Sequence, residues 1–266
     1  METLPGIIGR HEESESLLAC LHAGRHVLLE GPVGVGKTVL AAAAARRLGR
    51  GIVRVDGDGR YTEAKLVGQF DPPAVLAGGY RAEAFLAGPL VAAMRDGAVL
   101  FVNELNRMPE GVQNVLLPAM DERRVVVPML GEVRAAPGFA VLATQNPAEF
   151  VATASLSEAL LDRFELVRLD HASAAEEEDI VRQASSGAPD PGVVRAAVAI
   201  VRATRDDPRI RRGASVRAAI AIADIAAALG GDVARAARLA LPTRIELSDA
   251  HGNGLPEVLE DLAKKA

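Results

Sequence analysis

The sequence has few aromatic residues and a single cysteine. Its 266 residues include 6 Phe, 2 Tyr and no Trp, so extensive surfaces for stacking bases or sugars are not expected. One cysteine, Cys20, cannot form an internal disulfide or a multi-thiolate metal site. Together with the lack of a basic, then apolar leader at the start of the sequence, this predicts a cytoplasmic location.

The sequence also lacks a basic excess and a long apolar run. Its 30 Lys plus Arg are outnumbered by 35 Asp plus Glu, which gives a formal net charge of -5 and disfavours general binding to nucleic acid. The longest apolar stretches, such as residues 39–45, are shorter than the roughly 18 residues that cross a bilayer. With 49% hydrophobic residues, we expect a packed globular protein with no membrane span and no nucleic-acid partner.

The first 170 residues alternate aliphatic runs with helical patterns. The runs, which are typical of strands buried on both faces, cover residues 27–29, 52–55, 99–102 and 139–143. Helical patterns occur at residues 12–22, 39–48 and 82–95. This alternation predicts an α/β fold with a parallel sheet and helices on both of its faces. A short hairpin is expected within residues 123–137, projecting from the surface.

Strand signals fade after Asp170, and helical patterns at residues 191–204 and 214–229 replace them. We therefore expect two domains, an αβα domain over residues 1–170 and a small all-helical domain over residues 171–266. Pro118 falls within a helical pattern of the first domain, where we expect a kink or an early end of the helix.

A phosphate-binding motif directly follows the first strand. Residues 31–38, GPVGVGKT, match the P-loop pattern G-x-x-x-x-G-K-[ST] between a strand and a helix. Gly34 and Gly36 let backbone N–H groups turn toward phosphate oxygens, and the helix N-terminus adds a positive dipole. Lys37 is expected to neutralise the β- and γ-phosphates, and the Thr38 hydroxyl to ligate Mg²⁺. The glycine spacing does not fit the dinucleotide pattern G-x-G-x-x-G.

Polar residues end two of the later strands. The run AVLFVNE ends in Asn103 and Glu104, and a carboxylate at the tip of a strand adjoining the P-loop strand is suited to polarising the attacking water. The run FAVLATQNP carries Gln145 and Asn146, and an amide there can hold that water against the γ-phosphate. The second signal is weak alone, because Asn is also common in turns.

Several arginines allow more than one interpretation. Arg163 in LLDRF and Arg217 in GASVRAA can each stabilise transition-state charge, or can each be a surface residue or half of an ion pair. A further group comprises Arg205, Arg209, Arg211 and Arg212. We interpret this group as a lid and subunit-interface cluster rather than a nucleic-acid patch, because Asp206 and Asp207 interrupt it.

The order of GPVGVGKT, LFVNELNR, VLATQNP, SEALLDRF and GASVRAA resembles the AAA+ ATPases, and specifically their MoxR branch. The resemblance extends over nearly the whole chain, from GIIGR near the start. It implies an αβα nucleotide domain, a helical lid and a ring, usually a hexamer, with ATP bound between subunits. Residues 67–73 and the hairpin near Gly131 would be the family's helix-2 and pre-sensor-1 insertions.

The resemblance also implies roles for single residues: Lys37 and Thr38 in Walker A, Asn103 and Glu104 in Walker B, Asn146 as sensor 1, Arg163 as the arginine finger and Arg217 as sensor 2. The expected catalytic residues are Lys37, Glu104, Asn146, Arg163 and Arg217. The expected nucleotide-binding residues are Ile8, Gly31, Pro32, Val33, Gly34, Val35, Gly36, Lys37, Thr38, Val39 and Arg217. The expected magnesium ligands are Thr38 and Asn103.

One position departs from the family pattern, because Asn103 stands where Walker B normally has Asp. An amide accepts a hydrogen bond from a magnesium-bound water but carries no charge, so we expect weaker metal binding and slow hydrolysis. The resemblance implies a chaperone-like remodeller or activator of a protein client, often with a von Willebrand factor A-type partner. The alternatives are a nucleotide-gated scaffold with little turnover and a magnesium-chelatase-like motor subunit.

Overall fold

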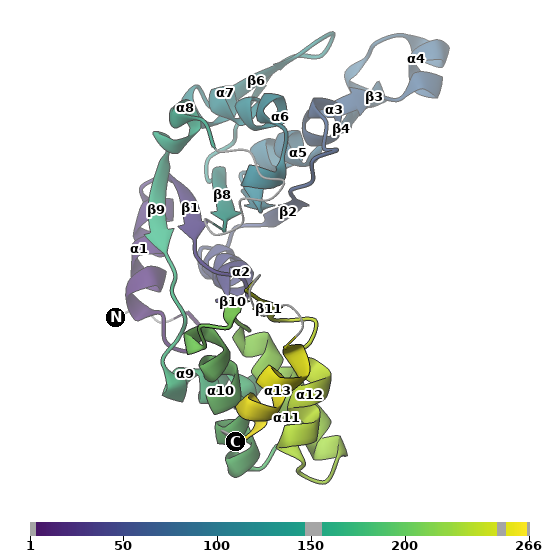
Figure 1. Ribbon diagram of the computed structural model, residues 1–266. Helices are drawn as coiled ribbons and strands as arrows, with labels where there is room; N and C mark the ends of the chain where they lie inside the picture. The colour runs from purple at the N-terminus through teal and green to yellow at the C-terminus, as the bar shows by residue number, and fades with distance from the viewer. Residues whose placement is uncertain (1–3, 147–155, 249–253, 265–266) are drawn as a thin grey trace. The chain divides into compact units, whose positions relative to one another are not determined.

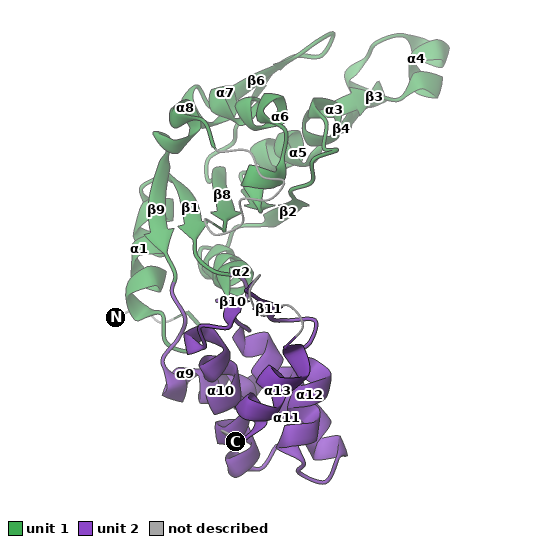
Figure 2. Cartoon of the chain, viewed as in Figure 1, with its two compact units in different colours: residues 1–32, 36–169 green, residues 33–35, 170–266 purple. Residues whose placement is uncertain are grey.

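The computed structural model describes residues 4–146, 156–248 and 254–264. The chain forms two compact units, which Figure 2 shows in different colours. Unit 1 comprises residues 1–32 and 36–169, and unit 2 comprises residues 33–35 and 170–266. The P-loop motif therefore contributes residues to both units.

Unit 1 is built on a five-stranded parallel sheet (Figure 1). Its strands are β1 (His26–Glu30), β2 (Ile52–Asp56), β5 (Val99–Asn103), β8 (Ala140–Gln145) and β9 (Phe164–Arg168), in the spatial order β2-β5-β8-β1-β9. The three central strands are buried along nearly their whole length, as their aliphatic sequences require. The parallel sheet expected from the sequence is confirmed.

Three features of this sheet differ from expectation. β8 lies between β1 and β5, so the strand that leads to Glu104 does not adjoin the P-loop strand. β9 is an additional edge strand in which buried and exposed residues are mixed. The expectation that residues 52–55 are buried on both faces is wrong, because β2 is the other edge strand and only its Val55 is buried.

Helices surround the sheet (Figure 1). They are α1 (His11–His22), α2 (Lys37–Arg47), α3 (Glu63–Val67), α5 (Pro89–Asp96), α6 (Glu110–Asn114), α7 (Leu116–Asp121) and α8 (Glu158–Leu161). The break between α6 and α7 confirms the expected effect of Pro118, which has no N–H to donate to the carbonyl of Asn114. Two short 3-10 turns, Ala82–Ala84 and Leu105–Arg107, complete this set.

The single helix expected over residues 82–95 is wrong. The chain instead forms the turn Ala82–Ala84 and the strand β4 (Phe85–Ala87), and α5 begins only at Pro89. A proline disfavours helical geometry in the residue before it, and Gly88 is accordingly extended, with ψ 173°.

Two antiparallel hairpins extend from unit 1. β3 (Gly68–Phe70) pairs with β4, and α4 (Pro72–Gly78) lies between them in sequence. β6 (Arg124–Val127) pairs with β7 (Gly131–Arg134), which confirms the expected hairpin. Leu76 of α4 is 89% exposed and Val126 of β6 is 73% exposed.

Unit 2 is mainly helical. Its elements are α9 (Ala174–Ala184), α10 (Pro191–Asp206), α11 (Val216–Ala228), α12 (Val233–Ala240), α13 (Leu255–Ala263) and a short strand pair, β10 (Ile210–Arg212) with β11 (Glu246–Leu247). Alanine, valine, leucine and isoleucine fill the buried core of its described residues, as the shortage of aromatics requires. In the described part of the chain, every helix is too short or too polar to cross a membrane.

The arginine group of unit 2 pairs with carboxylates. Arg205 lies 2.8 Å from Glu177, Arg209 lies 2.9 Å from Asp207 and 3.0 Å from Asp261, and Arg211 and Arg212 both pair with Glu246. These ion pairs favour a cluster with an internal structural role over a nucleic-acid patch.

Candidate functional site

The P-loop connects the end of β1 to the start of α2. Gly34 and Gly36 have φ values of 81° and 96°, which glycine adopts without a steric penalty. Gly36 is the N-cap residue of α2. It has no side chain that could accept a hydrogen bond from the first N–H groups of the helix. Those N–H groups and the helix dipole favour a bound anion at this position.

Gly31 lies where the backbone of another segment approaches closely. A Cβ atom at this position would lie 2.1 Å from the carbonyl oxygen of Leu169. The Leu169 N–H donates to the carbonyl of Glu30 at 2.8 Å, so this contact anchors the beginning of the loop to the segment after β9. Only glycine fits here.

Lys37 contacts its own loop. Its Nζ donates to the carbonyl oxygens of Gly31 at 2.6 Å and Pro32 at 2.9 Å, which holds the ammonium beside the loop backbone. Thr38, the next residue of α2, is partly exposed, as is Ile8. Val33 and Val39 are exposed by 39% and 56%.

Polar side chains form a hydrogen-bonded row along the carboxyl edge of the sheet. Asn103 Nδ2 donates to Asp56 Oδ1 at 3.0 Å, and Asn103 Oδ1 accepts from Thr144 Oγ1 at 3.1 Å. Thr144 Oγ1 in turn accepts the Glu104 N–H at 2.8 Å. On the other side of β8, Gln145 Nε2 donates to Glu30 Oε2 at 2.7 Å. The Gln145 amide therefore already donates a hydrogen bond to Glu30.

The row contains three residues that the sequence interpretation did not select: Asp56, Thr144 and Glu30. Asp56 and Glu30 are the last residues of β2 and β1. The rule that selected Glu104, a polar residue at the carboxyl end of a parallel strand, applies to them equally.

Glu104 has an unusual backbone for a non-glycine residue, with φ 57° and ψ 53°. Such left-handed geometry costs energy and gathers at functional sites. Its carboxylate lies 2.8 Å from Arg107 Nε, while its N–H is bound to Thr144. Both the backbone and the side chain of Glu104 are therefore held in place.

Asn146 directly follows β8, and it is only 8% exposed. It is the last described residue before a gap that ends at residue 155, so Pro147 of the predicted motif lies outside the described residues. Arg217 belongs to unit 2, where its exposed side chain is in the first turn of α11.

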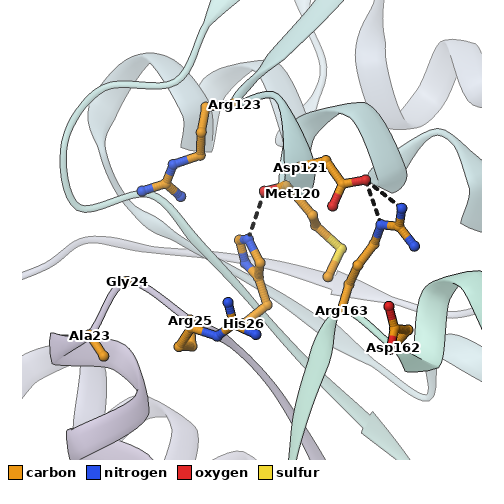
Figure 3. A pocket seen from close by; sticks show the side chains of 9 residues that line it. All are labelled: Ala23, Gly24, Arg25, His26, Met120, Asp121, Arg123, Asp162 and Arg163. Atoms are coloured by element: carbon orange, nitrogen blue, oxygen red, sulfur yellow. Dashed lines mark hydrogen bonds and ion pairs between the residues drawn. The ribbon is translucent and has the colours of Figure 1, made fainter.

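Arg163 lines a pocket of about 490 Å³ (Figure 3). The pocket is lined by Ala23, Gly24, Arg25, His26, Met120, Asp121, Arg123, Asp162 and Arg163. Arg163 Nε donates to Asp121 Oδ2 at 2.6 Å, and this bond raises the pKa of the guanidinium. The predicted arginine finger is therefore one partner of an ion pair at the start of β9.

His26 forms a buried part of the same pocket. Its Nδ1 accepts the Val141 N–H at 2.9 Å, and its Nε2 lies 3.3 Å from the Met120 carbonyl oxygen, a bond that Figure 3 also draws. These partners fit a neutral ring with its proton on Nε2. Burial lowers the pKa of His26 to about 4.

The residues proposed for magnesium offer oxygen donors, the Thr38 hydroxyl and the Asn103 amide. Within the described ranges no group of three or more His, Cys, Asp or Glu side chains is placed to hold a metal ion. That donor set fits Mg²⁺, which keeps several waters and takes its remaining ligands from substrate phosphates. It does not fit a metal held by protein ligands alone.

Comparisons with known proteins identify the family. Residues 26–164 match the model of the AAA domain, dynein-related subfamily. The chain is 35% identical over 161 residues to protein NorQ of Paracoccus denitrificans, covering 60% of this chain and 57% of NorQ. It is 29% identical over 232 residues to the gas vesicle ATPase GvpN of Ancylobacter aquaticus, covering 81% of this chain and 64% of GvpN. The matches thus span less than two thirds of either relative.

The solved structures agree in fold. RuvB of Thermotoga maritima, a Holliday junction branch migration motor, superposes with a TM-score of 0.57 at 21% identity, covering 87% of this chain and 70% of RuvB. At this identity the likeness shows the fold alone. With its P-loop, its five-stranded parallel sheet and the family match, the chain belongs to the AAA domain family, dynein-related subfamily, and is an AAA+ ATPase of the MoxR branch.

Proposed function

We propose that this chain hydrolyses ATP slowly and uses the energy to remodel or activate a protein client. The observation that supports this most strongly is the combination of a glycine-shaped P-loop with Glu104, whose backbone and carboxylate are both fixed. A fixed carboxylate at the carboxyl edge of the sheet is suited to orienting the attacking water.

The side chains would divide the work as follows. Lys37 exchanges its backbone carbonyl partners for phosphate oxygens, while Thr38 and Asn103 would hold Mg²⁺ directly or through water. Bound Mg²⁺ would neutralise phosphate charge. Glu104 orients the water, Asn146 holds it in line, and Arg217 binds the nucleotide from unit 2. Asn103 brings no charge to the metal, and hydrolysis is slow for that reason.

Arg163 would act on the ATP of a neighbouring subunit. It precedes Phe164, which is paired with His26 at the start of β1, whereas the P-loop follows Glu30 at the end of β1. The intervening strand is roughly 13 Å long, so Arg163 and its own P-loop lie at opposite ends of the sheet. This supports a homo-oligomeric ring, which we propose to be a hexamer, in which each Arg163 completes a neighbour's site.

The two hairpins would contact the client or a von Willebrand factor A-type partner. Leu76, Val126 and Met129 expose apolar side chains on them, Met129 by 69%, and exposed apolar groups are common at binding surfaces. The test is affinity capture with a Glu104→Gln variant loaded with ATP, with Lys37→Ala as the matched control that binds no nucleotide. A protein retained by the first variant and absent from the second supports client binding; equal retention contradicts it.

One observation favours a second candidate, a nucleotide-gated scaffold. Asn103 lacks the charge of an acidic residue, so it offers a metal ion only a neutral ligand. A scaffold would change its particle size when ATP binds and release no phosphate above the Glu104→Gln rate, with or without a partner. A remodeller releases phosphate faster when its partner is added.

A further inference from the structure

We propose that Asp56 and Gly57, at the end of β2, position Asn103 and Glu104 for hydrolysis, and that Asp56 is the reason why Asn rather than Asp stands at position 103. This inference rests on the proposed ATPase function and adds two positioning residues to it.

The first observation is the bonding of the Asn103 amide. Its two ends are used differently, because Nδ2 donates to Asp56 and Oδ1 accepts from Thr144. Arg54 holds the Asp56 carboxylate through Nε at 3.1 Å and Nη2 at 2.7 Å. A carboxylate at position 103 has no proton to donate to Asp56, so it would put two acidic groups against each other. Only an amide satisfies both neighbours.

The hydrogen-bonded row that begins at Asp56 also reaches Glu104. Thr144, which donates to Asn103, also accepts the N–H of Glu104. Asp56 therefore acts on Glu104 through two intermediate side chains, and β2 contributes to the site through this hydrogen-bonded row.

The second observation is independent and concerns the backbone. The Gly57 N–H donates to the Asn103 carbonyl at 2.7 Å. A Cβ atom at Gly57 would lie 2.1 Å from the carbonyl oxygen of Glu104 and 3.1 Å from that of Asn103. Any side chain here must displace the strained backbone of Glu104, so glycine is required for packing rather than for a positive φ.

The first experiment exchanges the two side chains, using the full-length protein as wild type, Asn103→Asp, Asp56→Asn and the double variant. Asn103→Asp supplies the charge that Asn103 does not bring to the metal, but it also sets two carboxylates against each other and breaks the hydrogen bond from Asn103 to Asp56. We expect the second effect to dominate, so that kcat falls about tenfold and the Tm of the nucleotide-free protein falls by about 2–4 °C. In the double variant, the amide at position 56 donates to the carboxylate at position 103, which reverses the direction of the hydrogen bond. Both kcat and the Tm should therefore recover. Asp56→Asn alone keeps a bond to the Asn103 amide and should be mild. ATP affinity measured in EDTA should be the same in all four proteins.

The second experiment uses a matched glycine pair. Gly57→Ala should lower kcat about tenfold at unchanged ATP affinity, because it shifts Glu104 and leaves the P-loop alone. Gly59→Ala, in the same loop, has only the Arg107 carbonyl oxygen at 3.9 Å as a neighbour and should retain wild-type kcat.

The outcomes separate the two proposals. If Asn103→Asp is as active and stable as wild type, and the double variant gains nothing over it, the positioning role is overturned while the ATPase function stands. If wild type releases no phosphate, the ATPase function fails; the Tm cycle of the nucleotide-free proteins then still decides whether Asp56 and Asn103 are coupled.

Discussion

His26 should make the stability of this chain sensitive to acid. Its ring is neutral and bound on both nitrogens, and a second proton would place Nδ1–H against the Val141 N–H that it now accepts. Burial lowers the pKa of His26 from 6.5 to about 4. Between these values the unfolded chain binds a proton that the folded chain does not, so the free energy of unfolding falls as pH decreases through this window.

The size of the effect follows from the pKa difference. At about 1.4 kcal/mol per pKa unit, the contribution lost is about 2 kcal/mol at pH 5 and about 3 kcal/mol below pH 4. The loss should affect the start of β1 and the Arg163 pocket first, because His26 belongs to both.

The assay is urea unfolding at pH 7.5, 6.5, 5.5 and 5, on wild type and His26→Asn. An Asn oxygen can accept from the Val141 N–H but does not titrate, so the difference between the two proteins should shrink by about 2 kcal/mol from pH 7.5 to pH 5. His22→Asn, at the exposed end of α1, is the control and should follow wild type. Parallel pH profiles for wild type and His26→Asn would refute this reasoning.

Three further perturbations have defined outcomes. Lys37→Ala and Arg163→Ala subunits should each be inactive in phosphate release. Mixing the two should restore activity, because the intact P-loop of an Arg163→Ala subunit then lies beside the intact Arg163 of a Lys37→Ala subunit. A mixture as inactive as its components contradicts action between subunits. Gly31→Ala should lower the Tm by several degrees, because the new Cβ would lie 2.1 Å from the Leu169 carbonyl oxygen and overpacking of this kind costs about 1–3 kcal/mol. Gly51→Ala, whose Cβ would have its nearest neighbour at 3.5 Å, is the control and should keep the wild-type Tm. Equal Tm values for the two variants contradict the packing argument. EDTA should abolish phosphate release and leave weakened ATP binding, and hydrolysis that persists without Mg²⁺ contradicts the proposed donor set.

The fold could be predicted where the signal is local. The apolar runs of β1, β5 and β8 and the P-loop follow from consecutive residues, and so does the break that Pro118 causes. The order of the strands could not be predicted, because it depends on pairings between distant segments; this is why Glu104 was assigned to a strand adjoining β1. The pair Gly88–Pro89 was a local signal that the helical periodicity of residues 82–95 obscured.

The same distinction applies to the site. Lys37, Thr38 and Glu104 belong to contiguous motifs, and their positions could be predicted. Asp56 reaches Asn103 across 47 residues of sequence, and only the register of β2 on β5 brings them together. Gly57 carries no sequence signal of its own, because its close approach to Glu104 is visible only in three dimensions.

Phosphate release by wild type and Glu104→Gln, with saturating ATP and Mg²⁺, tests the central claim most directly. The account predicts slow release by wild type that Glu104→Gln abolishes, with ATP affinity retained because the P-loop is intact. Equal rates for the two proteins would show that Glu104 does not carry the chemistry.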